Sequence, residues 1–126
     1  MKKEIIALIV LVLVFSASLL NIHFLTRLTG EITTLIEEVN EFIREEDWVS
    51  ARSRAEKASE KWEKSHPYTH MVLRQTELES VTNILDNLIK EIYAEESGAA
   101  KGMARAAIAR MRSVASIERI TFGNIF

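Results

Sequence analysis

Residues 5–25 read IIALIVLVLVFSASLLNIHFL and directly follow Lys2, Lys3 and Glu4. Between Glu4 and Arg27 there are 22 residues without a formal charge. As a helix they extend for about 33 Å at about 1.5 Å per residue, which is enough to cross the hydrocarbon core of a bilayer. We therefore predict that the protein lies at a membrane and that the lipid bilayer is one of its partners.

Two interpretations of this segment compete. A signal peptide has a basic start, a short apolar core and small residues before the cleavage site, and Ser16-Ala17-Ser18 fits that outline. An anchor instead continues as a helix, and here apolar residues recur beyond the small residues at steps of three and four. The recurring residues are Leu25, Leu28, Ile32, Leu35, Val39 and Phe42. Because cleavage after Ser18 would cut this helix in its middle, we favour an uncleaved anchor.

The charges beside the segment predict its orientation. Lys2 and Lys3 favour a cytoplasmic N-terminus, so a single-pass protein of the cell membrane would hold the remaining residues outside. We accordingly divide the chain into an N-terminal membrane anchor or signal-like segment, residues 1–27, and an extracytoplasmic helical bundle, residues 28–126.

Composition favours long helices. The 126 residues include one proline, Pro67, four glycines and no cysteine, which excludes disulfides and thiolate metal sites. The net charge of -2 gives no support for a general nucleic-acid binder.

Helix boundaries follow from local signals. The first helix should end near Arg44, and Asp47 should cap a second helix by accepting its free amide hydrogens. His66-Pro67 should end that second helix, because proline disfavours helical geometry in the residue before it. One stripe of the second helix holds Trp48, Ala51, Ala55, Ala58 and Trp62, and we expect both tryptophans to be at least partly buried.

The second half of the chain predicts two further helices. A third helix spans about residues 68–96, and Ser97-Gly98 should form the turn after it. Its stripe comprises Leu78, Val81, Leu85, Leu88 and Ile92. A fourth helix spans about residues 99–119, with an apolar tail at residues 121–126. Its inward residues are Met103, Ala107, Met111, Val114 and Ile117. An all-α fold follows, in which the transmembrane helix continues into an antiparallel bundle of about four helices without internal repeat.

Four features together resemble a known family. They are the apolar start after Lys2-Lys3, the Asp47-Trp48-x-x-Ala51 … Trp62 pattern, the acidic third helix and the ending Asn124-Ile125-Phe126. The chain resembles domain-of-unknown-function family 4363, uncharacterised membrane-anchored helical proteins of endospore-forming bacteria. The resemblance implies an anchored helical domain beside another membrane protein, and it carries over no activity and no catalytic residue.

Catalytic and metal chemistry find little support. His66 and His70 have the spacing of two metal ligands on one helical face, but Pro67 lies between them, so we expect polar residues in a turn. The many carboxylates lie at positions typical of solvent-facing charges, with Glu56, Glu60 and Lys64 four residues apart. We therefore expect no enzyme, no catalytic residue, no metal site and no cofactor.

Charge is distributed unevenly along the chain. Residues 31–96 include 16 acidic and 8 basic residues, whereas residues 101–126 include five basic residues and one acidic residue. Four of the basic residues fall within about 40° on a helical wheel at 100° per residue. They are Lys101, Arg105, Arg112 and Arg119. We expect this basic stripe to face the acidic helices of its own bundle, with anionic lipid or an acidic partner as the alternative.

Arg110 falls in the inward series of the fourth helix, beside Ala107 and Val114. A buried guanidinium needs a carboxylate or several carbonyl partners, so Arg110 could fix the helix register or line a binding groove. It could also extend its alkyl stem to solvent.

These patterns predict a function by class. The leading interpretation is an interaction module that serves as an accessory subunit of a membrane protein or assembly, with a homo-oligomer left open. The alternative is a sensor-like bundle that holds a small ligand between helices, near Arg110 and the tryptophans. The interaction residues predicted here are the basic stripe, Arg110, Trp48 and Trp62.

Overall fold

The computed structural model describes residues 1–67, 69 and 73–125, and side chains as far as residue 116. Four long helices account for most of this part of the chain, which contains no strand. They are α1 (Lys2–Arg44), α2 (Trp48–Lys64), α4 (Gln75–Tyr93) and α5 (Ser97–Ile125). The predicted all-α fold is confirmed.

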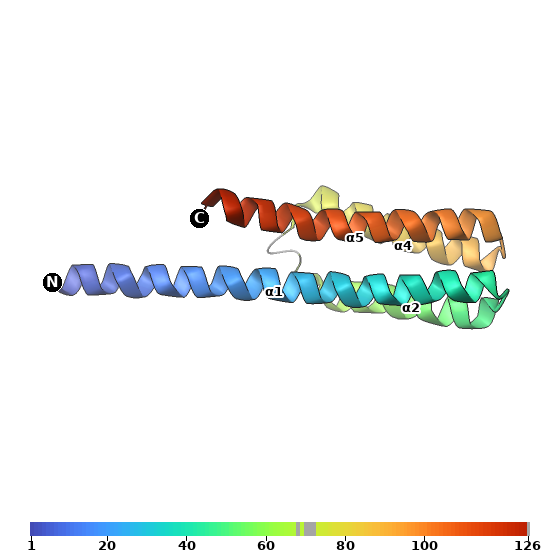
Figure 1. Cartoon of the computed structure of the whole chain (residues 1–126), viewed down its shortest axis with the longest axis horizontal. Coiled ribbons are helices and arrows are strands. Elements are labelled where there is room, and N and C mark those ends of the chain that lie inside the picture. The colour runs from blue at the N-terminus through green and yellow to red at the C-terminus, as the bar shows by residue number, and fades with distance from the viewer. Residues whose placement is uncertain (68, 70–72, 126) are drawn as a thin grey trace.

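The helices form an antiparallel bundle in which each helix has two neighbours. Helix α1 packs against α2 and α5, and α4 packs against the same two helices, while the described residues give no contact along the diagonals. Figure 1 shows the turns after α1 and α4 at one end of the bundle and both termini pointing away from that end. The N-terminal half of α1 projects alone beyond the bundle.

Helix α1 has two halves with opposite surroundings. Residues 1–17 are all exposed, including Ile5 at 57% and Leu13 at 63%. Burial begins at Leu25 and continues every three or four residues to Ile43 at the end of the helix. The helix is unbroken across residue 27, so the boundary between the predicted anchor and bundle lies within one rigid element.

The turn between α1 and α2 closes with a left-handed glutamate. Glu46 has a φ of 60°, and its amide donates to the carbonyl of Ile43 at 3.0 Å. The next amide, of Asp47, donates to the carbonyl of Phe42 at 2.8 Å, which completes a Schellman motif. The carboxylate of Asp47 then accepts from the amide of Ser50 at 3.2 Å, so the predicted cap of the second helix is confirmed.

The same turn recurs between α4 and α5. Glu95 has a φ of 56°, its amide donates to Ile92 at 3.0 Å, and the amide of Glu96 donates to Glu91 at 3.2 Å. The predicted turn at Ser97-Gly98 is therefore wrong, because α5 already begins at Ser97. The left-handed position that usually selects glycine is occupied here by glutamate, three residues before Gly98.

Two other boundaries differ from the prediction. Helix α4 begins at Gln75, because Arg74 has an extended backbone with φ -70° and ψ 149°. The predicted start at Tyr68 lies outside the described residues. Helix α5 continues to Ile125, so residues 121–125 are helical where the sequence predicted a tail. The predicted ends of α1 at Arg44 and of α2 before His66 are confirmed.

The two halves of the bundle repeat one packing pattern at an offset of 49 residues. In α2 the buried residues are Ala51, Ala55, Ala58 and Trp62, and in α5 they include Ala100, Ala104, Ala107 and Met111. In α4 they are Leu78, Val81, Leu85, Leu88 and Ile92, which correspond to Thr29, Ile32, Ile36, Val39 and Ile43 of α1. The expectation of no internal repeat is wrong at this level, since the two helical hairpins share burial positions, though seldom residue types.

Candidate functional site

The exposed half of α1 is the first candidate surface. Among the described residues, α1 is the one helix that is long and apolar enough to span a membrane, and its apolar window is unburied. A core helix of a soluble protein would bury such a window, so this half of α1 has no partner within the bundle.

The two tryptophans serve the core. Trp62 is 1% exposed, and its indole Nε1 donates to the hydroxyl of Thr82 in α4 at 3.1 Å. Trp48 is partly buried against the same core. The expected burial of both residues is confirmed.

Arg110 lies on the outside of α5. Its residue is exposed, while Ala107 and Met111 on either side are buried. The inward series therefore passes from Ala107 to Met111, and the interpretation of Arg110 as a buried, register-fixing cation is wrong.

The basic stripe does not pair with acidic helices. Arg105 and Arg112 are exposed, Lys101 is partly exposed, and none of them forms an ion pair with a side chain in the described part of the chain. Helix α5 packs against α1 and α4, as the internal interpretation predicts, but the expected pairing of Arg105 and Arg112 with acidic side chains is not found in the described part of the chain. The side chain of Arg119 lies outside the described residues.

Two acidic residues of α1 instead pair with basic residues of α2. Arg54 of α2 pairs with Glu38 at 3.1 Å, and Lys61 of α2 pairs with Glu31 at 3.0 Å. Hydrogen bonds from Lys61 and then Arg27 hold the pKa of Glu31 below its ordinary value of 4.5. Helix α1 thus forms ion pairs with α2 and presents hydroxyl groups toward α5.

A second polar contact joins α2 to α4. The phenol of Tyr93 donates to the carboxylate of Glu56 at 2.7 Å, and the guanidinium of Arg52 lies 4.1 Å from the centroid of the Tyr93 ring. The hydrogen bond to Glu56 raises the pKa of Tyr93, because the bond stabilises the protonated phenol.

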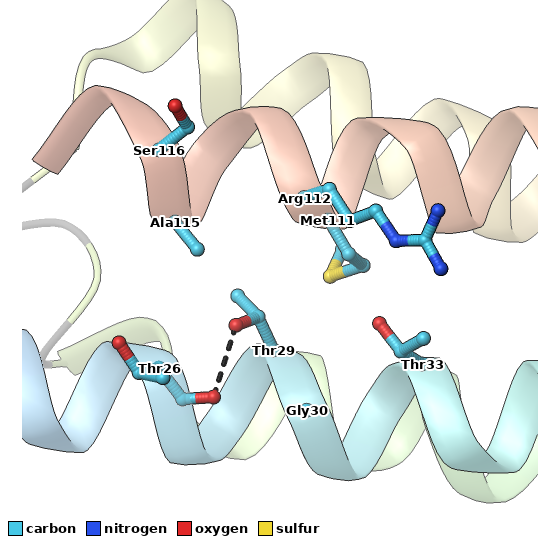
Figure 2. A pocket seen from close by; sticks show the side chains of 8 residues that line it. All are labelled: Thr26, Thr29, Gly30, Thr33, Met111, Arg112, Ala115 and Ser116. Atoms are coloured by element: carbon cyan, nitrogen blue, oxygen red, sulfur yellow. Dashed lines mark hydrogen bonds between the residues drawn. The ribbon is translucent and has the colours of Figure 1, made fainter. Parts of the chain in front are cut away.

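An open groove of about 370 Å³ lies between α1 and α5 at the end of the bundle nearest the apolar half of α1. Its lining residues are Thr26, Thr29, Gly30, Thr33, Met111, Arg112, Ala115 and Ser116. Figure 2 shows Arg112 extending from α5 along the groove on the side of Thr33, whose hydroxyl points toward α5. Thr29 donates its hydroxyl proton to the carbonyl of Thr26 at 3.1 Å, so it offers the groove only an acceptor.

Sequence reasoning found Arg112 but missed the α1 side of this groove. Thr26, Thr29 and Thr33 are spaced by three and four residues, which places them on one face of a helix beside the apolar stripe. That spacing was the available signal. What the sequence lacks is the identity of the neighbouring helix, which depends on how the bundle closes.

A second hollow, of about 270 Å³, lies nearer the turn end between the same two helices. It is lined by Asn40, Arg44, Lys101 and Arg105. Arg44 is already paired with Glu41 at 3.3 Å, and the lining contains three cations and no hydroxyl. This hollow is basic, as the first groove is at Arg112, but it lacks the hydroxyl groups of the first groove.

Metal chemistry has no visible centre in the described residues. No group of three or more His, Asp or Glu side chains there could hold a metal ion. His70, one of the two histidines considered as ligands, lies outside the described part of the chain.

The fold defines a class of protein: a four-helix bundle built on a long helix whose first half is apolar and exposed. The chain belongs to the family described as Domain of unknown function (DUF4363), whose model matches residues 19–125. No curated protein and no solved structure matches the chain. The family match covers the whole bundle and the last part of the apolar segment.

Proposed function

We propose that this protein is a membrane-anchored interaction module, a single-pass accessory subunit whose bundle stands outside the cytoplasm. One observation carries the proposal: α1 is both the exposed apolar helix and a core helix of the bundle. Anything that binds the bundle is then held at a fixed height above the bilayer. Lys2 and Lys3 support a cytoplasmic N-terminus.

The exposed residues of the bundle indicate which kind of surface a partner would present to it. Among described residues beyond Phe24, the large apolar side chains that are exposed are Val49 and Tyr93. Since such scattered residues do not form an apolar patch, a partner would contact the bundle through charged and polar groups. The other contact available to a membrane partner is the apolar half of α1. The proposal assigns the chain no catalytic role and no cofactor.

Membrane extraction and protease accessibility test this proposal together. The full chain should stay in the membrane fraction after an alkaline carbonate wash, and protease added outside intact cells should digest the bundle. A variant with Lys2 and Lys3 both changed to Glu serves as the control for orientation, and its bundle should become less accessible. Recovery of a soluble product beginning near Leu19 would contradict the anchor.

A second experiment addresses the accessory role. The full chain, purified from membranes in a mild detergent, should migrate as a complex with an integral membrane protein in fixed ratio. A chain whose residues 5–24 are replaced by an unrelated apolar helix separates contacts through the span from contacts through the bundle. Migration of the pure chain alone would contradict an accessory subunit.

A sensor-like bundle that binds a small ligand between helices is the second candidate function. The groove between α1 and α5 favours it, because this space is open, is lined from both helices and contains the guanidinium of Arg112 and hydroxyl groups. The expected position near Arg110 and the tryptophans does not apply, since Arg110 is exposed and Trp62 is enclosed in the core.

A further inference from the structure

We propose that the groove between α1 and α5 binds a phosphate-type oxyanion, held by Arg112 and the hydroxyl of Thr33. The inference rests on the second candidate function and names the chemistry of its ligand. The anion could be a free phosphate ester or the phosphate of a lipid headgroup.

The internal repeat shows that the groove is a specific departure from the packing of the bundle. At an offset of 49 residues, the groove between α1 and α5 corresponds to the interface between α4 and α2. There Trp62 stands in place of Met111, and it fills the space by contacting Thr82, the counterpart of Thr33. The space is open on the α5 side because a smaller side chain occupies the position of the indole.

The α1 side of the groove also carries smaller side chains than the corresponding side of α4. Thr29 and Gly30 stand where α4 has Leu78 and Glu79, so both side chains are smaller than their counterparts. A Cβ atom built on Gly30 meets nothing within 4 Å, which means that no neighbour requires glycine there. Glycine inside a helix costs about 0.5–1 kcal/mol relative to alanine. Glycine at this position leaves the groove without a side chain from residue 30, at a cost in helix stability.

The charge of the lining is also reversed. Arg112 corresponds to Glu63 of α2, and Gly30 corresponds to Glu79 of α4. Two carboxylates at the α2–α4 interface are therefore replaced in the groove by one cation and a residue without a side chain. Arg112 forms no ion pair with the side chains described, which leaves its donors available. A guanidinium fork matches two oxygens of a phosphate, and the hydroxyl of Thr33, which points toward α5 (Figure 2), can donate to a third oxygen.

The groove begins at the depth of lipid headgroups, which leaves a lipid phosphate as one source of the anion. Thr26, at the membrane end of the groove, lies two residues beyond Phe24, the last exposed apolar residue before Leu25 is buried, and Thr33 lies nine residues beyond it. At about 1.5 Å per residue these distances are about 3 Å and about 14 Å along α1. The headgroup region occupies about 5–8 Å on each side of the hydrocarbon core, so a lipid phosphate would have to rise beyond it to reach Thr33, whereas a free phosphate ester would not.

Calorimetric titration of the full chain in dodecyl maltoside micelles, which contain no phosphate, tests the proposal. One arm uses inorganic phosphate and glycerol phosphate, and the other uses short-chain phosphatidylglycerol added to the micelles. Saturable binding is expected in at least one arm, and the arm that binds identifies the source. Absence of binding in both arms would overturn the proposal, even if carbonate extraction shows the chain anchored.

Two pairs of variants locate the site. Arg112→Gln should weaken binding by at least about tenfold, because a charge-assisted hydrogen bond is lost. Arg110→Gln removes the same charge from an exposed position on the same helix and should bind as the unmodified protein does. Equal loss in both variants would mean a diffuse charge effect and would also overturn the proposal.

The second pair keeps the charge constant. Gly30→Leu places a side chain in the groove and should weaken binding, whereas Gly102→Leu adds the same side chain at an exposed glycine of α5 that also has open space around it. Circular dichroism of each variant checks that the helices are retained. If Gly30→Leu folds and binds normally, the anion does not occupy the groove.

Discussion

The indole Nε1 of Trp62 in α2 lies 3.1 Å from the hydroxyl oxygen of Thr82 in α4 and donates a hydrogen bond to it. With 1% of its surface exposed, Trp62 is the largest enclosed side chain of the described core. A single residue thus supplies both volume and a polar link between two helices.

Trp62→Ala should lower the free energy of unfolding by about 3–5 kcal/mol, because it leaves a cavity in the core. Trp62→Phe keeps most of the volume and loses only the bond to Thr82, so its cost should be about 1–2 kcal/mol. Denaturant titration of the full chain in detergent measures both. Trp48→Ala is the control, and as Trp48 is only partly buried it should cost less than Trp62→Ala.

The two left-handed glutamates offer a stabilising change. Glu46→Gly and Glu95→Gly should each raise the free energy of unfolding by about 1 kcal/mol, since glycine adopts a φ near 60° without the Cβ clash. Glu45→Gly is the matched control, because Glu45 has a φ of -83° and gains nothing from glycine. Thermal melting of the three variants decides, and a gain at Glu45 alone would contradict the assignment.

Stability should depend on pH through Glu31. Its pKa is lowered in the folded state by Lys61 and Arg27, so its contribution is complete above the ordinary value of 4.5 and is lost as the pH falls through the folded value. The side chain is 41% exposed, so the contribution should stay below about 1 kcal/mol. Glu31→Gln should abolish this part of the acid dependence, which lies below the ordinary value of 4.5, in denaturant titrations, and Glu37→Gln, an exposed change on the same helix, should not.

Replacing a helical glycine by alanine should raise the stability of the bundle where the added methyl group has room. Gly30→Ala and Gly102→Ala should each raise the free energy of unfolding by about 0.5–1 kcal/mol, because both positions are helical and have room for a methyl group. Gly98→Ala should gain less, since Gly98 is the second residue of α5, where the helical backbone is less constrained. Differential scanning calorimetry ranks the three, and a loss at Gly30 would mean that its surroundings are closed.

Local signals predicted much of the fold. The cap at Asp47, the end of α1 at Arg44 and the inward stripe from Ala51 to Trp62 each depend on a few neighbouring residues, and all are confirmed. The start of α5 was predicted wrongly because the turn uses Glu95 in a conformation that composition assigns to glycine. Propensity is a weak guide when tertiary packing selects the turn.

The groove and the repeat depend on pairing across the bundle, which no local window contains. Met111 and Trp62 occupy equivalent positions, yet their residue types show no likeness in the sequence. The open space beside Met111 follows only once α5 is known to lie against α1. For the same reason the individual neighbours of the basic stripe could not be predicted: Arg112 lies beside threonines of α1, whereas Lys101 and Arg105 lie beside Asn40 and Arg44.

Helix α1 runs for 43 residues without interruption, a rod of about 64 Å. Its apolar half and the threonines of the groove therefore move as one body. The direction of the apolar half therefore fixes the direction of the threonine face of the groove, because no break in the helix separates the two.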